Sequence, residues 1–220
     1  ICLPKHFMIS HHHKCIFIHI PKTGGTSIEN VLRQDKSKGS NHRFLSEYSN
    51  YSVFNTYFKF AIVRNTYDRI WSLYSYYSSG GNQQNLQTLT DYYHHYKNRV
   101  LKFPYYTDLE ISKNIPVTFH DFCEIFLKEG KPFFRRHVLQ SQLDYISING
   151  KIQLDFLGKF DCLENDFSKV AKQLGVKENL PHLRKSLSKG HYSEFYNEAT
   201  KKIVENYYQD EISYFKFKFD

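Results

Sequence analysis

The sequence predicts one α/β domain with a helical insertion, and two strand–turn–helix units carry this prediction. In the first unit, the apolar run Cys15–Ile20 is followed by a glycine-containing turn and a helical pattern over Ser27–Arg33. In the second unit, the apolar run Phe58–Val63 ends at Arg64 and precedes a helical pattern that Thr66 is expected to cap. The length of 220 residues fits a single domain with its own core.

The middle of the chain is predicted to hold two loops and two further helices. Polar residues over Asp35–Asn41 and the Ser, Gly, Asn and Gln residues over Ser78–Asn85 are typical of loops. Helical patterns cover about Leu86–Leu101 and Thr118–Lys128. The second pattern opens with a threonine three residues before Asp121, which resembles a capping box.

The Asn149-Gly150 pair is the strongest hairpin signal in the chain, because this dipeptide favours two-residue turns between antiparallel strands. It is predicted to join strands over Leu143–Ile148 and Lys151–Phe156. Two helices complete the prediction, one over Leu163–Leu174 that Gly175 ends and one from Ser193 through about Tyr214.

Composition and charge limit the possible functions. The 18 Tyr and 19 Phe residues predict an aromatic core. The 30 Lys and Arg residues against 22 Asp and Glu residues give a formal net charge of +8, which predicts an anionic partner. No apolar run approaches the roughly 20 residues of a membrane span. The four cysteines form no C-x-x-C pair, which indicates neither a zinc site nor a disulfide framework and favours a reducing compartment.

The turn PKTGGTS after the first predicted strand carries the first chemical signal. Backbone N–H groups and the helix dipole at such a turn attract phosphate oxygens. Gly24 and Gly25 allow an anion to approach closely, Lys22 adds a positive charge, and Thr26 and Ser27 add hydroxyl donors. The nucleotide triphosphatase pattern G-x-x-x-x-G-K-[ST] is not met, because the lysine precedes the glycines. The alternative interpretation is an ordinary strand-to-helix turn with a chance lysine.

The segment AIVRNTYDRIWSLY carries the second signal. Arg64 follows the C-terminal end of a predicted strand, where open α/β sheets bind ligands, and Ser72 lies eight residues later in the next helix. An arginine and a hydroxyl that converge there would hold a second phosphate. Taken singly, Arg64 is also consistent with a surface ion pair and Ser72 with a residue of no special role.

Together the two segments resemble the sulfotransferases that use 3′-phosphoadenosine 5′-phosphosulfate (PAPS), in the branch of heparan-type carbohydrate sulfotransferases and small bacterial relatives. In that family a P-K-T-[AG]-G-[TS]-[ST] turn binds the 5′-phosphosulfate and an R-N-P-x-x-R-x-x-S-x-Y segment binds the 3′-phosphate. Here they stand as Pro21–Ser27 and Arg64–Tyr74, in the same order and spacing, with Thr66 at the usual proline position. The resemblance implies a three-layer P-loop-like core with a central parallel sheet flanked by helices, plus a helical insertion.

Later segments extend the resemblance to nearly the whole chain. They are QSQLDYI, LGKFDCLENDF, LPHLRKS and YQDEISYFKFKF. The resemblance thus implies a single sulfotransferase domain over residues 1–220, in which a variable insertion over residues 78–116 shapes the acceptor site. LPHLRKS would close over the nucleotide, and a basic surface loop is its alternative interpretation. The implied donor-binding residues are Lys22, Thr23, Gly24, Gly25, Thr26, Ser27, Arg64, Ser72, Arg184, Lys185 and Ser186.

The implied reaction moves a sulfuryl group from PAPS to an acceptor hydroxyl of a carbohydrate and leaves adenosine 3′,5′-bisphosphate (PAP). Lys22 is suited to stabilise charge on the leaving phosphate, as in phosphoryl transfer. His42, in NHRFLSEY, lies where family members carry a catalytic histidine, and Glu47 is a second candidate base. A surface histidine is the alternative role of His42. No metal is expected, and the His11–His13 run is interpreted as a solvated segment.

Two other functions are consistent with parts of the sequence. The net charge of +8 and the many aromatic residues fit a basic module that binds single-stranded nucleic acid, but no recognition motif appears and the basic residues are scattered. A P-loop-type nucleotide kinase fits the turn, but the lysine is misplaced and no acidic strand end for magnesium is evident. We therefore expect a nucleotide donor and a glycan or other hydroxyl acceptor, with no nucleic-acid partner and no membrane span.

The compartment and the acceptor groove are predicted only in outline. A cytoplasmic enzyme of bacterial type is expected, with the lumenal catalytic domain of a Golgi membrane enzyme as the alternative if an anchor precedes Ile1. Aromatic and histidine side chains in the insertion are candidates for sugar stacking, although a core role is favoured for most of them. They are Tyr92, Tyr93, His94, His95, Tyr105 and Tyr106.

Overall fold

The computed structural model of the protein describes residues 8–33, 42–78, 118–130, 136–181 and 190–220. The chain divides into two compact units, the first formed by residues 1–65 and 137–185 and the second by residues 66–136 and 186–220. The predicted loops over 35–41 and 79–85 and the predicted helix Leu86–Leu101 lie outside the described residues, as does most of the proposed insertion over 78–116.

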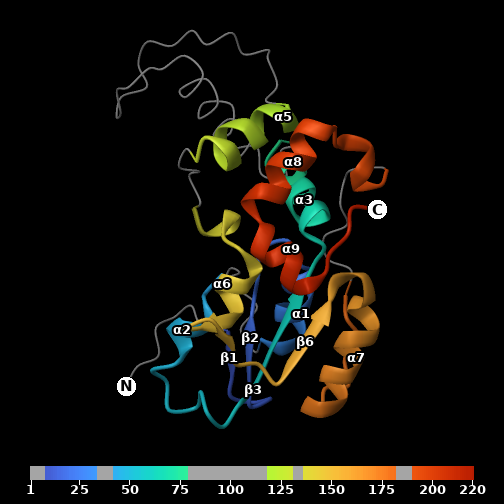
Figure 1. The fold of residues 1–220 in the computed structure, drawn as a ribbon. Helices are drawn as coiled ribbons and strands as arrows, with labels where there is room; N and C mark the ends of the chain where they lie inside the picture. The colour runs from blue at the N-terminus through green and yellow to red at the C-terminus, as the bar shows by residue number, and fades with distance from the viewer. Residues whose placement is uncertain (1–7, 34–41, 79–117, 131–135, 182–189) are drawn as a thin grey trace, which may run out of the picture. The chain divides into compact units, whose positions relative to one another are not determined.

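The first unit is built on a four-stranded sheet with the order β1-β2-β3-β6 (Figure 1). β2 (Cys15–Ile18), β3 (Phe58–Val63) and β6 (Phe156–Lys159) are parallel, whereas the short β1 (Ile9–Ser10) pairs with β2 in the antiparallel sense. The two predicted buried strands are therefore confirmed, and β3 has the predicted bounds. Because β2 and β3 are parallel neighbours, their C-terminal ends lie at the same edge of the sheet.

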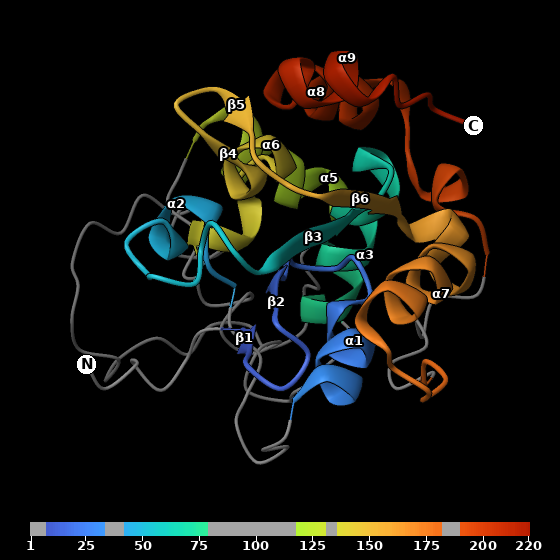
Figure 2. The ribbon, with the colours of Figure 1, turned by 90° about the horizontal axis from the view of Figure 1, so that it is seen from below.

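Helices cover both faces of this sheet. On one face, α1 (Gly25–Leu32) and α7 (Leu163–Leu174) pack against alternate residues of β2 and β3, such as Phe17 and Phe60, and these side chains form one buried cluster. α2 (Leu45–Tyr48) and α6 (Gln142–Ile146) lie on the other side (Figure 2). The unit thus has the expected three-layer α/β architecture with a mixed, mainly parallel sheet.

The hairpin at Asn149-Gly150 is confirmed, with shorter strands than predicted. Both turn residues have positive φ values, 51° and 73°, as a type I′ turn requires. Its strands are only β4 (Ser147–Ile148) and β5 (Lys151–Ile152). The expected strand before the turn is mostly the helix α6, which starts because Ser141 Oγ accepts a hydrogen bond from Leu143 N at 3.2 Å.

The helix α7 follows the prediction to the residue. The 3₁₀ turn η3 (Phe160–Cys162) leads into it, and Gly175 ends it with a left-handed φ of 68°. Asp166 in α7 joins the helix to β6, because its Oδ2 accepts a hydrogen bond from Lys159 N at 2.9 Å. This link ties one helical layer to the edge strand of the sheet.

The second unit is helical in its described part. It contains α3 (Thr66–Ser78), α5 (Phe119–Phe122), the π-helix η1 (Cys123–Lys128), the 3₁₀ turn η4 (Tyr192–Phe195), α8 (Glu198–Tyr207) and α9 (Gln209–Phe215). The 3₁₀ turn η2 (Arg136–Leu139) has residues in both units. The capping box of Thr118 with Asp121 is confirmed. The core is aromatic, as expected: Trp71 stacks on Phe195 with 3.9 Å between ring centroids.

Two predictions about helix starts in this unit are wrong. The C-terminal helix begins at Glu198 rather than Ser193, because the Asn197 side chain accepts a hydrogen bond from Thr200 N and caps it, and it breaks at Tyr208 before α9. Thr66 is the first residue inside α3 rather than its cap. Its hydroxyl donates instead to buried Glu211, which satisfies that carboxylate.

Candidate active site

The turn PKTGGTS joins β2 to α1 as predicted, and its backbone is unusual. Lys22 has a φ of 70° and Gly24, the residue before α1, has a φ of 81°. A left-handed lysine is uncommon, and such residues gather at functional sites. α1 begins with no side-chain cap and no acidic residue in its first turn. The positive end of the α1 dipole is thus not balanced by a side chain of that turn.

The two glycines are required by close packing in the protein itself. A Cβ on Gly24 would lie 2.8 Å from Leu163 Cδ2, and a Cβ on Gly25 would overlap the ring of His19. The hydroxyl of Thr23 points inward and donates to Ile20 O at 2.9 Å, and Thr23 is fully buried. Any contact of Thr23 with a ligand would therefore have to use its backbone.

Arg64 reaches this turn from the end of the neighbouring strand β3. Its Nη1 donates to Lys22 O at 3.0 Å, and its guanidinium carbon lies 4.1 Å from the centroid of the Phe160 ring. A guanidinium stacked on an aromatic ring and tied to a carbonyl is held in place, which prepares it for an anion. The structure thus brings Arg64 to the backbone of the lysine that the sequence selected independently.

Gln142 holds the backbone of Arg64 from the opposite layer. Its Oε1 accepts from Arg64 N at 2.9 Å, and its Nε2 donates to Arg64 O at 2.8 Å. Gln142 is fully buried, so this two-point contact is shielded from water. The sequence marked the segment QSQLDYI without naming this residue, and only a partner 78 positions away reveals its role.

His42 lies at the C-terminal end of β2, beside the same turn. Its Nδ1 is 3.0 Å from His19 O, and because a carbonyl only accepts, His42 Nδ1 is the donor. In the neutral ring, the free lone pair is then on Nε2, which is the atom that can accept a proton. The ring of His137 is 6.0 Å away between centroids, so a second imidazole stands near. The sequence did not select His137.

The carboxylate of Glu47, the second candidate base, is engaged locally. Its Oε1 accepts from Arg43 Nη1 and its Oε2 accepts from Phe44 N, each at 2.8 Å. These contacts form the start of α2. Both oxygens of the Glu47 carboxylate are thus engaged within the protein, so the geometry favours His42 over Glu47 as the base.

The other predicted donor-binding residues fall into three groups. Thr26 and Ser27 lie in the first turn of α1, and Ser27 N donates to Gly24 O at 3.1 Å. Ser72 is buried in α3 of the second unit, so a shared phosphate site with Arg64 stays a prediction. Arg184, Lys185 and Ser186 lie outside the described residues.

The buried cysteines are not suited to act as nucleophiles, and the described residues form no metal site. Burial raises the pKa of the Cys15 thiol to about 12 and also raises the pKa of the Cys123 thiol, so neither is a thiolate near neutral pH. Among the described residues, no group of three His, Cys, Asp or Glu side chains could hold a metal ion. Within the same ranges, no helix is both long enough and apolar enough to cross a membrane.

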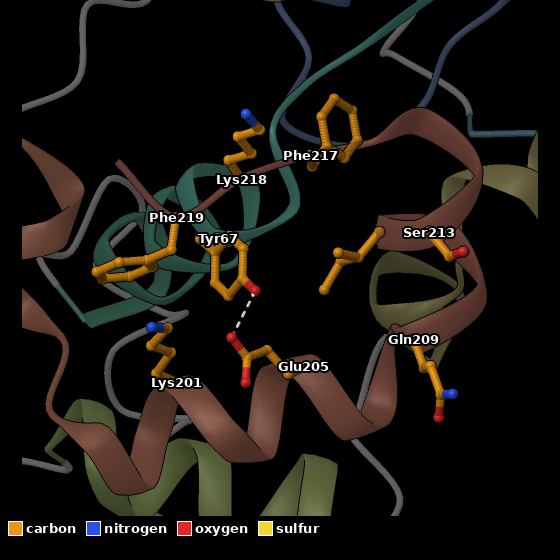
Figure 3. Close-up of a pocket in the computed structure, with 9 residues that line it drawn as sticks. Tyr67, Lys201, Glu205, Gln209, Ser213, Phe217, Lys218 and Phe219 are labelled. Atoms are coloured by element: carbon orange, nitrogen blue, oxygen red, sulfur yellow. Dashed lines mark hydrogen bonds between the residues drawn. The ribbon is translucent and has the colours of Figure 1, made fainter.

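An open pocket of about 480 Å³ lies in the second unit and contains none of the predicted site residues (Figure 3). Tyr67, α8, α9 and the C-terminal segment line it. In it, the Tyr67 hydroxyl donates to Glu205 Oε1 at 3.0 Å. Burial and then this hydrogen bond raise the pKa of Tyr67, so the hydroxyl stays protonated.

The first unit defines the class of protein: an α/β fold with a P-loop-like strand–turn–helix, whose turn is contacted by an arginine from the next strand. A scan against models of protein families matches the chain to the sulfotransferase family over residues 5–218. The chain therefore belongs to the sulfotransferase family and is an enzyme that transfers sulfuryl groups. Searches of curated proteins and of solved structures found no match.

Proposed function

We propose that this sulfotransferase transfers a sulfuryl group from PAPS to a hydroxyl of a carbohydrate, with His42 as the base. The contact of Arg64 Nη1 with Lys22 O is the observation that carries the proposal, because it joins the two predicted phosphate-binding segments at one edge of the sheet. PAPS supplies an activated sulfuryl group on a phosphate anhydride. The proposal includes the heparan-type branch, a single catalytic domain and the donor-binding residues named from the sequence.

The residues at the turn fit a donor with phosphate at both ends. The start of α1, which lacks a cap and an acidic neighbour, favours the negative charge of the 5′-phosphosulfate. Lys22 is assigned to the leaving phosphate oxygen, where negative charge grows during transfer. Arg64, held by Phe160 and by Gln142, is assigned to the 3′-phosphate as a preorganised bidentate donor.

Proton transfer in the proposed reaction depends on the tautomer of His42. The hydrogen bond of Nδ1 to His19 O favours the ring with its lone pair on Nε2. Nε2 would accept the proton of the acceptor hydroxyl as that oxygen attacks the sulfur. A positioned general base of this kind contributes about 10²- to 10⁴-fold to the rate.

A carbohydrate acceptor is proposed from the family resemblance and from the charge of the chain. The proposed donor site uses four of the 30 Lys and Arg residues, so about half of the net charge of +8 is left to attract an acidic acceptor. An acidic glycan has both the hydroxyls and the charge that this surface favours.

The direct test is transfer of labelled sulfate from PAPS to panels of glycans, phenols and lipids by the wild type, His42→Ala and the control His12→Ala. His12 is an exposed histidine on the β1–β2 turn of the same unit. We expect labelled glycans, a rate for His42→Ala that is lower by about 10²- to 10⁴-fold, and wild-type activity of the control. Labelled phenols alone would refute the carbohydrate acceptor, and full activity of His42→Ala would refute the base.

A further inference from the structure

His19 and Glu29 form a buried pair of side chains, and His19 contacts both the first residue of α1 and His42. His19 Nδ1 is 2.9 Å from Glu29 Oε1, and both side chains are 4% exposed. The two atoms are in close polar contact without the alignment of a full hydrogen bond. Arg33 Nη2 donates to the same Glu29 oxygen at 3.1 Å. A buried carboxylate is tolerated only when it is paired, so Glu29 and its partners hold one another in place.

The ring of His19 occupies the space that a side chain at the start of α1 would need. A Cβ on Gly25 would overlap the His19 ring, so the imidazole lies directly against the first residue of this helix. Phe17 also stacks on the His19 ring, with 5.6 Å between ring centroids. Glu29 lies one turn after Gly25 in the same helix and contacts Nδ1 of the His19 ring. The position of His19 is therefore tied to the start of α1.

His19 also contacts His42 at two points. Its carbonyl accepts the hydrogen bond from His42 Nδ1 at 3.0 Å, and its ring meets the His42 ring edge-on with 4.3 Å between centroids. The carbonyl selects the tautomer of His42, and the ring limits how far the His42 imidazole can rotate. One residue thus touches both the helix start assigned to the donor and the proposed base.

We propose that the Glu29–His19 pair is a positioning device that sets the orientation of His42 relative to the PKTGGTS turn. This inference rests on the proposed function, since it gives His42 the role of base. Neither His19 nor Glu29 touches the reacting atoms. They act through His42, because a base must lie within hydrogen-bond reach of the proton it removes.

The test is a double-mutant cycle of Glu29→Gln and His42→Ala, with Asp166→Asn as the matched control. Glu29→Gln keeps the shape and removes the charge that holds His19, and Asp166→Asn makes the same change at a buried carboxylate in α7. We expect Glu29→Gln to lower kcat by about tenfold to a hundredfold, with less than about a twofold change in the Kd of PAP. Asp166→Asn should leave kcat unchanged.

The double-mutant cycle distinguishes a role of Glu29 in positioning His42 from a general loss of structure. If Glu29 acts through His42, Glu29→Gln lowers the residual activity of His42→Ala no further. An equal loss in both backgrounds, or weakened PAP binding by Glu29→Gln, would overturn the inference. His19→Leu provides a second variant, which should show the same loss of kcat with unchanged PAP binding.

The outcomes for the two proposals are distinct. An inactive His42→Ala enzyme together with a fully active Glu29→Gln or His19→Leu enzyme would overturn the positioning role and keep the base. Full activity of His42→Ala would overturn the base and the positioning role together, whereas PAP binding would still report on the donor site.

Discussion

Lys22 and Gly24 both adopt left-handed backbone conformations in the turn before α1, and only one of them is a glycine. A left-handed conformation costs a residue with a Cβ about 1–2 kcal/mol. At Gly24 the cost of a side chain is larger, because Leu163 and Phe160 fill the space beside its Cα. Packing around the turn therefore has to offset the backbone strain at Lys22.

Replacement of Gly24 by alanine tests this account at the scale of one residue. Gly24→Ala adds the left-handed cost to a clash with Leu163 Cδ2, so we expect a loss of about 2–5 kcal/mol in the free energy of unfolding. Gly175→Ala is the matched control, since Gly175 has a φ of 68° and no atom within 4 Å of an added Cβ. It should lose only about 1–2 kcal/mol in urea unfolding. Equal losses would contradict the packing argument.

The sequence selects candidate site residues whose signals are local, and it gives no signal for residues whose partners are distant in the chain. Lys22, the two glycines and Arg64 stand in short motifs that show their chemistry directly. Gln142, Phe160 and the pairing of His19 with Glu29 carry no such signal. Each of them becomes visible only when the fold brings separate segments together, so no local pattern identifies them.

At the scale of elements, sequence signals were most reliable where local chemistry fixes an end. β3 ends at Val63, just before Arg64, and α7 ends at Leu174, just before Gly175, as predicted, since an apolar run and a C-terminal glycine define those limits. The C-terminal helix was misplaced because Ser193 and Asn197 are both good caps, and Tyr192 and Phe195 pack as a separate 3₁₀ turn. Tertiary packing decided between these two starts.

The contact between α7 and β6 gives a pH-dependent stability. Burial alone raises the pKa of Asp166, but hydrogen bonds from Lys169 and Lys159 N and the charges of both lysines outweigh it and lower the pKa. The ionised carboxylate therefore stabilises the fold fully above its unfolded pKa of about 3.9, and this stabilisation is lost as the pH falls through the lower folded value.

Urea unfolding of the wild type and Asp166→Asn from pH 7 to pH 3 measures this contribution. We expect the variant to be less stable by a constant amount from pH 7 down to about pH 5, and the difference to shrink as the pH falls below about 4. A difference that is constant over the whole range would show that ionisation of Asp166 does not stabilise α7 on the sheet.

At the scale of the whole molecule, the net charge of +8 predicted an anionic partner without identifying it. The family match assigns sulfuryl transfer, and the Arg64–Lys22 contact gives part of this charge a specific place. A nucleic-acid module would bind single strands with a steep dependence on salt. The proposed donor site would instead bind a single nucleotide through the PKTGGTS turn and Arg64.

Thermal unfolding with PAP tests the central claim most directly, in the wild type, Lys22→Ala, Arg64→Ala and the control Lys202→Ala, an exposed lysine in α8. With PAP at about a hundred times its Kd, we expect the wild type and the control to gain about 5–10 °C in Tm. Lys22→Ala and Arg64→Ala should lose this gain. A wild-type Tm that does not change with millimolar PAP, or an equal gain in all four proteins, would contradict the account.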